Sequence, residues 1–141
     1  MNVKIKLSNN AKVPYRQTKG SSGYDLYSNE EVILEPNDIV LVSTGVFMEI
    51  PLGYEAQVRP RSGLAFKKGI TVLNTPGTID SDYRGEVKVI LINLSKNRVI
   101  LEKHERVAQL VFQKIEDVEF SLDILSDSKR GDGGFGSSGT K

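Results

Sequence analysis

The sequence predicts an all-β protein, a β-sandwich or barrel with one short helix. Short runs of β-branched and aliphatic residues recur along the chain, separated by turns of glycine, proline and asparagine, and this spacing is typical of such folds. The runs do not alternate with long helices, which argues against a doubly wound α/β fold. With 141 residues, the chain is long enough to bury the core of one domain.

The first strand is expected near the N-terminus. There Val3, Ile5 and Leu7 alternate with polar residues, which is the period of a half-buried strand. Seven further runs have strand character and are bounded by turn residues. They lie at residues 31–34, 38–42, 45–50, 54–60, 98–101, 106–115 and 118–120.

A wide β-hairpin is expected at residues 72–93. Its second arm, residues 86–93, is dense in β-branched and aliphatic residues and predicts a largely buried strand. Gly77 beside Pro76 interrupts the first arm, and such a glycine often marks a bulge or a close approach to the backbone. Six residues, 80–85, connect the arms, where a tight turn needs only two. A decorated polar turn and a site that carries chemistry both explain this excess.

One short helix is expected at residues 64–68, with Ser62 as its N-cap and Gly69 as its stop. Free amides and the positive end of the helix dipole would converge at its start, next to Arg61 and the small residue Gly63. The start of this helix is therefore a candidate anion site. Simple capping explains the same residues without a ligand.

Composition excludes several kinds of chemistry. The chain has no cysteine, so disulfides, thiol catalysis and thiolate metal sites are ruled out. The single histidine, His104, lies in a charged run that favours a solvated position over a triad or a zinc site. The balance of 19 basic and 18 acidic residues argues against a nucleic-acid polymer as partner. Because neither a membrane-spanning run nor a signal-peptide core is present, we expect a cytoplasmic protein without a membrane partner.

Asp25 stands between the large neighbours Tyr24 and Leu26. An acid in such surroundings needs a partner or a metal-bound water nearby. A capping or turn role would explain it nearly as well.

The C-terminal residues 130–141 contain five glycines, too many for an ordered core element. We therefore expect a β domain at residues 1–129 and a flexible glycine-rich arm at residues 130–141. Arg130 and the single aromatic residue Phe135 suit a lid that offers a guanidinium to phosphate and a ring to a base. A plain flexible tail is the alternative.

Five segments in this order resemble the five motifs of the trimeric dUTP pyrophosphatase (dUTPase) family. They are SSGYDL, PRSGL, NTPGTIDSDYRGE, ERVAQLVF and RGDGGFGSSG, and they extend over nearly the whole chain. The resemblance implies a jelly-roll-like β fold and a homotrimer with active sites at subunit interfaces. It also implies Mg²⁺-dependent hydrolysis of dUTP to dUMP and diphosphate. That reaction limits uracil incorporation into DNA and supplies dUMP for thymidylate synthesis.

The resemblance implies roles for the residues of the hairpin. Asp80 matches the catalytic acid, which activates the attacking water and touches the deoxyribose 3′-OH. Tyr83 matches the residue that packs under the sugar and leaves no room for a 2′-OH. The uracil-reading groups match Asn74 and the backbone of Gly77, Thr78 and Ile79. If the turn centres near Ser81, Lys88 lies opposite Asn74 and its backbone completes the base contacts.

The other motifs imply the phosphate and metal contacts. Asp25 matches the acid that holds Mg²⁺ through water, the ion itself being chelated by the triphosphate. Gln109 matches a residue that positions the phosphate chain and water, whereas His104 matches no catalytic role. The phosphate-holding motif matches Arg61, Ser62 and Gly63, and the closing arm matches Arg130, Phe135, Ser137 and Ser138. Many relatives have threonine where Ser138 stands, and a hydroxyl is kept here.

Two other functions fit the same motifs. The dCTP deaminases share the fold and similar phosphate motifs, but deamination needs a different acid and base arrangement from that of IDSDYRG. A non-catalytic dUTP-sensing protein is the second alternative, and retention of all five motifs argues against it. Release of pyrophosphate or of ammonia, or tight binding without hydrolysis, separates the three.

Overall fold

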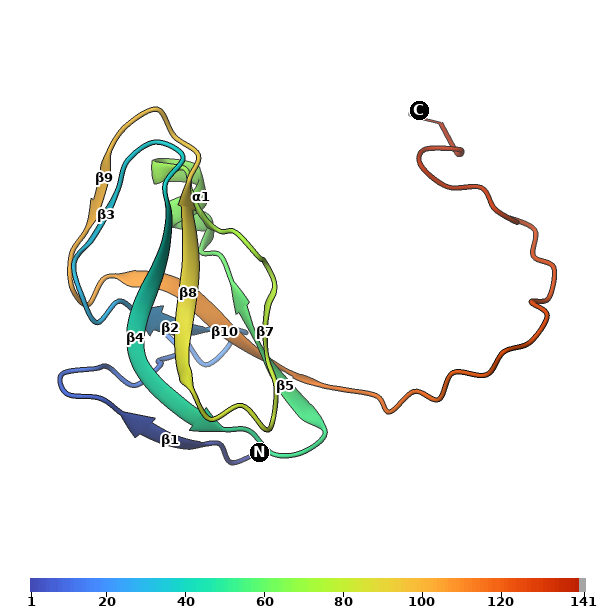
Figure 1. Ribbon diagram of the computed structural model, residues 1–141, viewed down its shortest axis with the longest axis horizontal. Helices are drawn as coiled ribbons and strands as arrows, with labels where there is room; N and C mark the ends of the chain where they lie inside the picture. Colours follow the sequence, from blue (N-terminus) through green and yellow to red (C-terminus); the bar gives the residue numbers. More distant parts are fainter. Residues whose placement is uncertain (140–141) are drawn as a thin grey trace.

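The computed structural model describes residues 1–139, which form a jelly-roll-like β-sandwich (Figure 1). Two four-stranded antiparallel sheets have the strand orders β1-β4-β8-β6 and β2-β10-β5-β7, and β3 and β9 form a small third sheet. The strands are β1 (Lys4–Leu7), β2 (Tyr24–Tyr27), β3 (Val32–Leu34), β4 (Ile39–Glu49), β5 (Tyr54–Arg59), β6 (Ile70–Val72), β7 (Gly77–Ile79), β8 (Glu86–Asn93), β9 (Val99–Leu101) and β10 (Arg106–Lys114). The one helix of the described residues is α1 (Ser62–Lys68). The predicted all-β class with one short helix is confirmed.

The core lies between the two large sheets. In β8, Val87, Val89 and Leu91 are buried, and they alternate with residues that face outward. Ala56 and Val58 of β5 are buried from the opposite sheet. Each valine or leucine among them contributes about 1.5–3 kcal/mol when fully buried, and this favours the register that places these side chains in the core.

The strand β4 differs from the prediction, which placed two separate strands in this region. The strand runs unbroken through a bulge, with a register shift between Ser43 and Val46. Gly45 lies in the bulge at φ 67°. A Cβ there would be 2.3 Å from Ser8 Oγ and 2.6 Å from Ala11 Cβ, so only glycine fits. The residue that suggested a turn is in fact what lets the strand continue.

Two other strand predictions need correction. The strand expected at 118–120 does not form, and the described residues after Lys114 contain neither strand nor helix. At the N-terminus β1 forms, but Ile5 is 41% exposed and does not give the expected half-buried face. The strand β2 was not predicted as one. Its Asp25 interrupts the apolar pattern, and the strand is stabilised by pairing with the distant β10.

The helix begins at Ser62, the residue that was assigned as its cap. Arg61, with extended backbone angles, is the N-cap, and Ser62 is already the first helical residue. No side chain caps the first turn, so the prediction of Ser62 as N-cap is wrong. Gly69 ends the helix as predicted: it lies at φ 66° and its N–H donates to Ala65 O at 3.1 Å.

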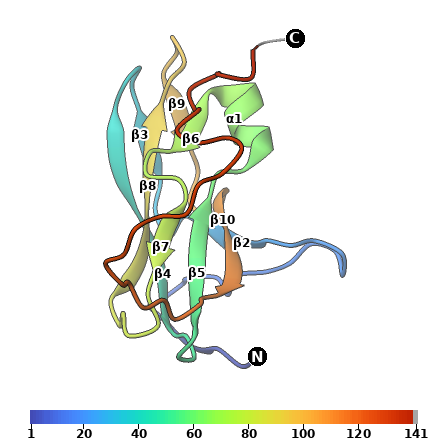
Figure 2. The same ribbon diagram turned by 90° about the vertical axis from the view of Figure 1, so that its right-hand side faces the viewer.

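The predicted hairpin at residues 72–93 is not one two-stranded ribbon. The second arm is β8, as predicted. The first arm divides, because β6 pairs with β8 while β7 pairs with β5 of the opposite sheet. In Figure 2, β7 lies beside β5. The two arms therefore splay apart and leave a space between the sheets.

The C-terminal segment leaves the β-sandwich after β10 and extends away from it, orange to red in Figure 1. The expected boundary between residues 129 and 130 lies inside this segment. Residues 140–141 of the expected arm lie outside the described residues. Within residues 1–139, no helix is long and apolar enough to cross a membrane, and a cytoplasmic location stays a prediction.

Candidate active site

A pocket opens where the two arms splay, and we call it the slot. It has a volume of about 310 Å³. Its walls come from β7, β8 and the residues that connect them. Seven predicted site residues line it, namely Asn74, Gly77, Thr78, Ile79, Asp80, Tyr83 and Lys88. Leu41, Val58, Glu86 and Ile90 complete the lining. The structure thus brings together the hairpin residues expected to bind the nucleoside, but not Phe135, which was expected to stack on uracil.

The slot is lined at Gly77 by main chain that has close neighbours on two sides. A Cβ at Gly77 would lie 3.1 Å from Asn74 Nδ2 and 3.4 Å from Val58 Cβ. A side chain here would press on both neighbours, so the glycine keeps the Asn74 amide close to the main chain of β7. The chain reaches this position through a cis Thr75–Pro76 peptide bond. The predicted close approach to the backbone at Gly77 is confirmed.

Asp80 and Tyr83 lie at the mouth of the slot. The Tyr83 hydroxyl donates to the main-chain oxygen of Glu86 at 3.0 Å, and its ring covers Gly85, where a Cβ would be 2.3 Å from the hydroxyl oxygen. Asp80 is exposed, and its carboxylate has no hydrogen bond or ion pair to another of the described residues. The slot therefore carries a fixed ring and an available carboxylate.

Lys88 lines the slot but not in the expected register. Pairing between β6 and β8 joins Val72 to Leu91, and Leu73 N donates to Ile90 O at 2.9 Å. Lys88 pairs instead with Ser43 of β4. Asn74 and Lys88 are therefore not cross-strand partners, because the hairpin arms separate before reaching them.

A second group of predicted residues gathers on the other large sheet. The strand register aligns Asp25 of β2, Gln109 of β10 and Arg59 of β5 in one row. Gln109 Nε2 donates to Pro60 O at 2.9 Å, which ties the row to the start of α1. A pocket of about 490 Å³ lies here, lined by Gln57, Arg59, Pro60, Ser62, Thr75, Pro76 and Gln109.

Asp25 is held by two arginines, and we call this group the arginine cluster. Arg61 Nε lies 3.2 Å from Asp25 Oδ1, and Arg106 donates to Oδ2 at 3.1 Å. Gln17 Nε2 also donates to Oδ2, at 2.9 Å, and the Asp25 side chain is only 12% exposed. The expected partner of this acid is thus found within the chain. Arg106 was not singled out from the sequence, although it lies within ERVAQLVF.

The arginine cluster fits a metal held through water. A carboxylate offers about four acceptor positions, and three are used here, so one remains for a water hydrogen. No three His, Cys, Asp or Glu residues within residues 1–139 could hold a metal ion by themselves. The donor set suits Mg²⁺ that keeps its water and is bound mainly by another molecule.

The two pockets lie on opposite sides of β5. Successive residues of a strand point to opposite faces, and Val58 lines the slot whereas Gln57 and Arg59 line the second pocket. The slot and the pocket that Ser62 of the phosphate motif lines are therefore separate pockets of one chain.

The arm residues lie outside both pockets. Arg130 Nε donates to Gly133 O at 2.6 Å, and Phe135 is fully exposed. The expected arm residues Arg130, Phe135, Ser137 and Ser138 line neither pocket. His104 also lines neither pocket and contacts Asn10 O through Nε2 at 2.7 Å.

On a β-sandwich, this arrangement suits an enzyme that binds a nucleotide, because the slot offers a carboxylate with no partner among the described residues and the arginine cluster offers positive charge. The sequence profile of the family described as dUTPase matches residues 9–139. The chain therefore belongs to the dUTPase family. It is a hydrolase of nucleotide metabolism, a dUTP diphosphatase.

Comparisons with individual relatives agree with this family assignment. Deoxyuridine 5′-triphosphate nucleotidohydrolase of Hydrogenobaculum sp. (strain Y04AAS1) is 57% identical over 138 residues, 96% of each chain. The dUTPase of Staphylococcus bacteriophage 80alpha, solved with dUpNHpp, is 32% identical with a TM-score of 0.91 over 99% of each chain. A mutant dUTPase from phage phi11 of S. aureus, described with a coordinated structural Mg(II) ion, is 26% identical with a TM-score of 0.83; the match covers 91% of this chain and 100% of that one.

Proposed function

We propose that the slot binds the uracil and deoxyribose of dUTP and that Asp80 activates the water that attacks the α-phosphorus. The observation that carries the proposal is the Asp80 carboxylate, which has no partner among the described residues and lies at the mouth of a pocket with exposed main chain. An aspartate side chain is ionised at neutral pH, so it can accept the proton of an attacking water. The phage 80alpha enzyme solved with the dUTP analogue dUpNHpp supports the choice of nucleotide.

Selectivity for uracil follows from main-chain groups. The backbone of Gly77, Thr78, Ile79 and Lys88, with the Asn74 amide, offers hydrogen bonds to the O4 acceptor and N3–H donor of uracil. Cytosine presents the reversed pattern and would leave buried groups unpaired, at a cost of about 1–3 kcal/mol each. The narrow approach at Gly77 leaves no space for the thymine methyl group.

Selectivity for deoxyribose follows from Tyr83. Its hydroxyl is bound to the main chain of Glu86, so the ring cannot swing away from the sugar. A ring fixed under the sugar excludes a 2′-OH. Asp80 beside it is placed to contact the 3′-OH as well as the water.

The phosphate chain would be held by the residues at the start of α1 and by Gln109 of β10. Arg61, Ser62, Gly63 and Gln109 bind and orient the phosphates, and Asp25 contacts the hydration shell of Mg²⁺ through its remaining acceptor position. Bound Mg²⁺ would supply positive charge to the triphosphate oxygens. The phi11 structure with Mg(II) supports the choice of ion.

The active unit that we propose is a homotrimer with each site at a subunit interface. One chain presents the slot and the second pocket on opposite sides of β5, and this separation supports a site that a second chain completes. The outward face beside the slot is apolar, because Leu41 pairs with Ile90 and Ile39 pairs with Ile92. Such a face favours burial against another chain.

The C-terminal segment supports the same assembly. Val118, Phe120, Leu122 and Ile124 alternate with polar residues and are all exposed. This pattern is typical of a strand whose partner edge lies on a neighbouring chain. From there Arg130, Ser137 and Ser138 would reach the outer phosphates and Phe135 would stack on uracil. Closure of this arm would exclude bulk water from the site.

Product analysis tests the proposal. Purified protein is incubated with Mg²⁺ and each nucleoside triphosphate in turn, and pyrophosphate and ammonia are measured. We expect pyrophosphate and dUMP from dUTP alone. Ammonia from dCTP would indicate a deaminase, and tight dUTP binding without hydrolysis would indicate a sensing protein. The dUMP formed would supply thymidylate synthesis and keep uracil out of DNA.

A further inference from the structure

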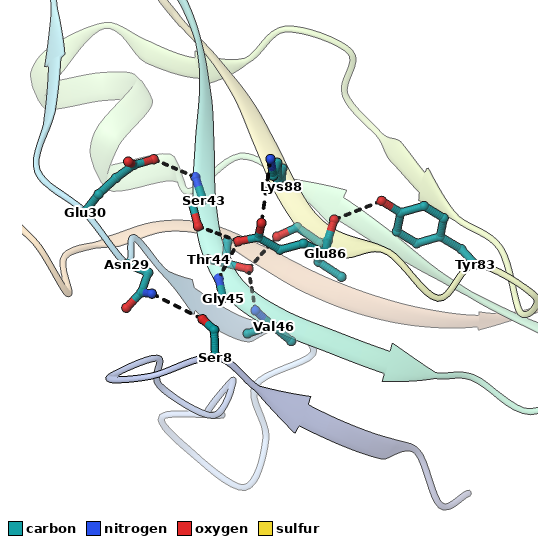
Figure 3. A network of polar contacts seen from close by, with 11 residues as sticks. Ser8, Asn29, Glu30, Ser43, Thr44, Gly45, Val46, Tyr83, Glu86 and Lys88 are labelled. Carbon is teal, nitrogen blue, oxygen red and sulfur yellow. Dashed lines mark hydrogen bonds and ion pairs between the residues drawn. The ribbon is translucent and has the colours of Figure 1, made fainter.

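Glu86 joins the wall of the slot to the bulge of β4 (Figure 3). Its Oε1 accepts hydrogen bonds from Ser43 Oγ and from the Gly45 N–H, the latter at 2.8 Å. Its Oε2 lies 3.7 Å from Lys88 Nζ, and its side chain is only 18% exposed. The Glu86 carboxylate therefore has three partners on two adjacent strands.

The bulge is a rigid anchor for this carboxylate. Gly45 has no room for a side chain, so its position is set by the packing around it. The neighbouring Thr44 is buried, and its hydroxyl donates to Val87 O and accepts from Val46 N at 3.2 Å. Glu86 is thereby held from the β4 side as well as by its own strand.

The fixed position of the Glu86 carboxylate matters because the slot contains other charged side chains. Among the residues that line the slot, Lys88 is the one cation, and Asp80 and Glu86 are the two acids. The Lys88 side chain is flexible and 44% exposed, and it lines the same slot as both acids, so its ammonium is attracted to each carboxylate. Glu86 forms an ion pair with Lys88, and Asp80 has no ion pair among residues 1–139.

We infer that Glu86 is a positioning residue that binds the Lys88 ammonium and so keeps the Asp80 carboxylate free to activate water. The inference rests on the proposed role of Asp80. Burial raises the pKa of the Glu86 carboxyl, but the Ser43 and Gly45 hydrogen bonds and the Lys88 charge outweigh burial and leave the pKa below its ordinary value of 4.5. The carboxylate is therefore charged at neutral pH, as the pairing requires.

The variant Glu86→Gln tests the negative charge of Glu86 separately from its hydrogen bonds to β4. Glutamine keeps an oxygen that accepts from Ser43 and Gly45 but loses the attraction for Lys88. We expect kcat/KM for dUTP to fall about tenfold or more, mostly in kcat, because a freed Lys88 competes for the catalytic carboxylate. The melting temperature and oligomeric size should change little. The matched control is Glu49→Gln, which removes a Glu–Lys pair on the same sheet outside the slot, and it should leave kcat/KM unchanged.

The double variant Glu86→Gln with Lys88→Met is the decisive measurement. Removing the ammonium should restore at least half of the lost kcat, which a purely structural defect would not allow. Unchanged activity in Glu86→Gln, or a loss that Lys88→Met does not reduce, would overturn the inference. Failure of the underlying function is distinguishable, because then the wild-type protein would not hydrolyse dUTP or Asp80→Asn would remain active.

Discussion

The slot and the arginine cluster each contain an aspartate, but the two aspartates lie in opposite environments. Asp80 in the slot is exposed and unpaired among the described residues, whereas Asp25 is nearly buried and bound by Arg61, Arg106 and Gln17. A free carboxylate can take up a proton or orient water at once. A carboxylate with three donors instead holds neighbouring cations in place. This difference indicates that the Asp80 carboxylate suits the chemical step, whereas the Asp25 carboxylate holds charged groups in position.

The largest expected effect comes from Asp80→Asn. Asparagine keeps the size of the side chain but cannot act as a base, so kcat should fall by a factor of about 10²–10⁴. The melting temperature should be unchanged, because Asp80 makes no stabilising contact with the described residues. Steady-state kinetics and calorimetric titration with dUTP check both points. Normal turnover would refute the assignment of Asp80 as the base.

Removal of residues 130–141 should have the next largest effect. Without Arg130 and Phe135 the site stays open to bulk water, and kcat/KM should fall by about a hundredfold. The hydrogen bonds of residues 128–139 stay within that segment, as far as the described residues show, so stability should be nearly intact. Thermal unfolding of the truncated protein measures this. A large fall in the melting temperature would make the arm a structural element.

Asp25→Asn should lower stability more than Asp80→Asn does, in contrast to the loss of turnover expected for Asp80→Asn. Loss of the charge leaves Arg61 and Arg106 without their carboxylate, and we expect the free energy of unfolding to fall by about 1.5–3 kcal/mol. The concentration of Mg²⁺ needed for half-maximal activity should also rise. Chemical denaturation and a Mg²⁺ titration provide the two measurements. Equal stability of the Asp25 and Asp80 variants would remove the contrast between the two sites.

The smallest expected effect is the pH dependence of the stability that Glu86 contributes. Because the pKa of Glu86 is lower in the folded protein than its ordinary value of 4.5, its ionised form adds stability above that pH. This contribution is lost as the pH falls through the lowered pKa. The stability advantage of the wild type over Glu86→Gln should therefore be constant near neutral pH and shrink below about pH 4.5. Urea unfolding at several pH values tests the trend, and an advantage that grew on acidification would contradict it.

The local patterns of the chain predict most of its strands. The alternation in β8 and the turn residues around β5 are visible in the sequence, because burial on one face leaves a period of two. The five motifs also contain about two thirds of the residues that line the two pockets. The continuous β4 was missed because the sequence signal of Gly45 is the same for a turn and for a bulge.

What the sequence alone does not show is long-range pairing. The division of the hairpin depends on β7 joining β5, and the role of Arg106 depends on the register of β10 against β2. Neither register leaves a local signal. Glu86 was missed for the same reason, since its partners Ser43 and Gly45 are some forty positions away.

The placement of the two pockets on opposite sides of β5 has a genetic consequence in the proposed trimer. Chains that carry Asp80→Asn and chains that lack a working arginine cluster would be inactive alone. Mixed and reassembled, they would complement each other, since some interfaces would join an intact slot to an intact cluster. Conversely, an allele defective in both the slot and the cluster, expressed with the wild type, would impair more than its own share of sites.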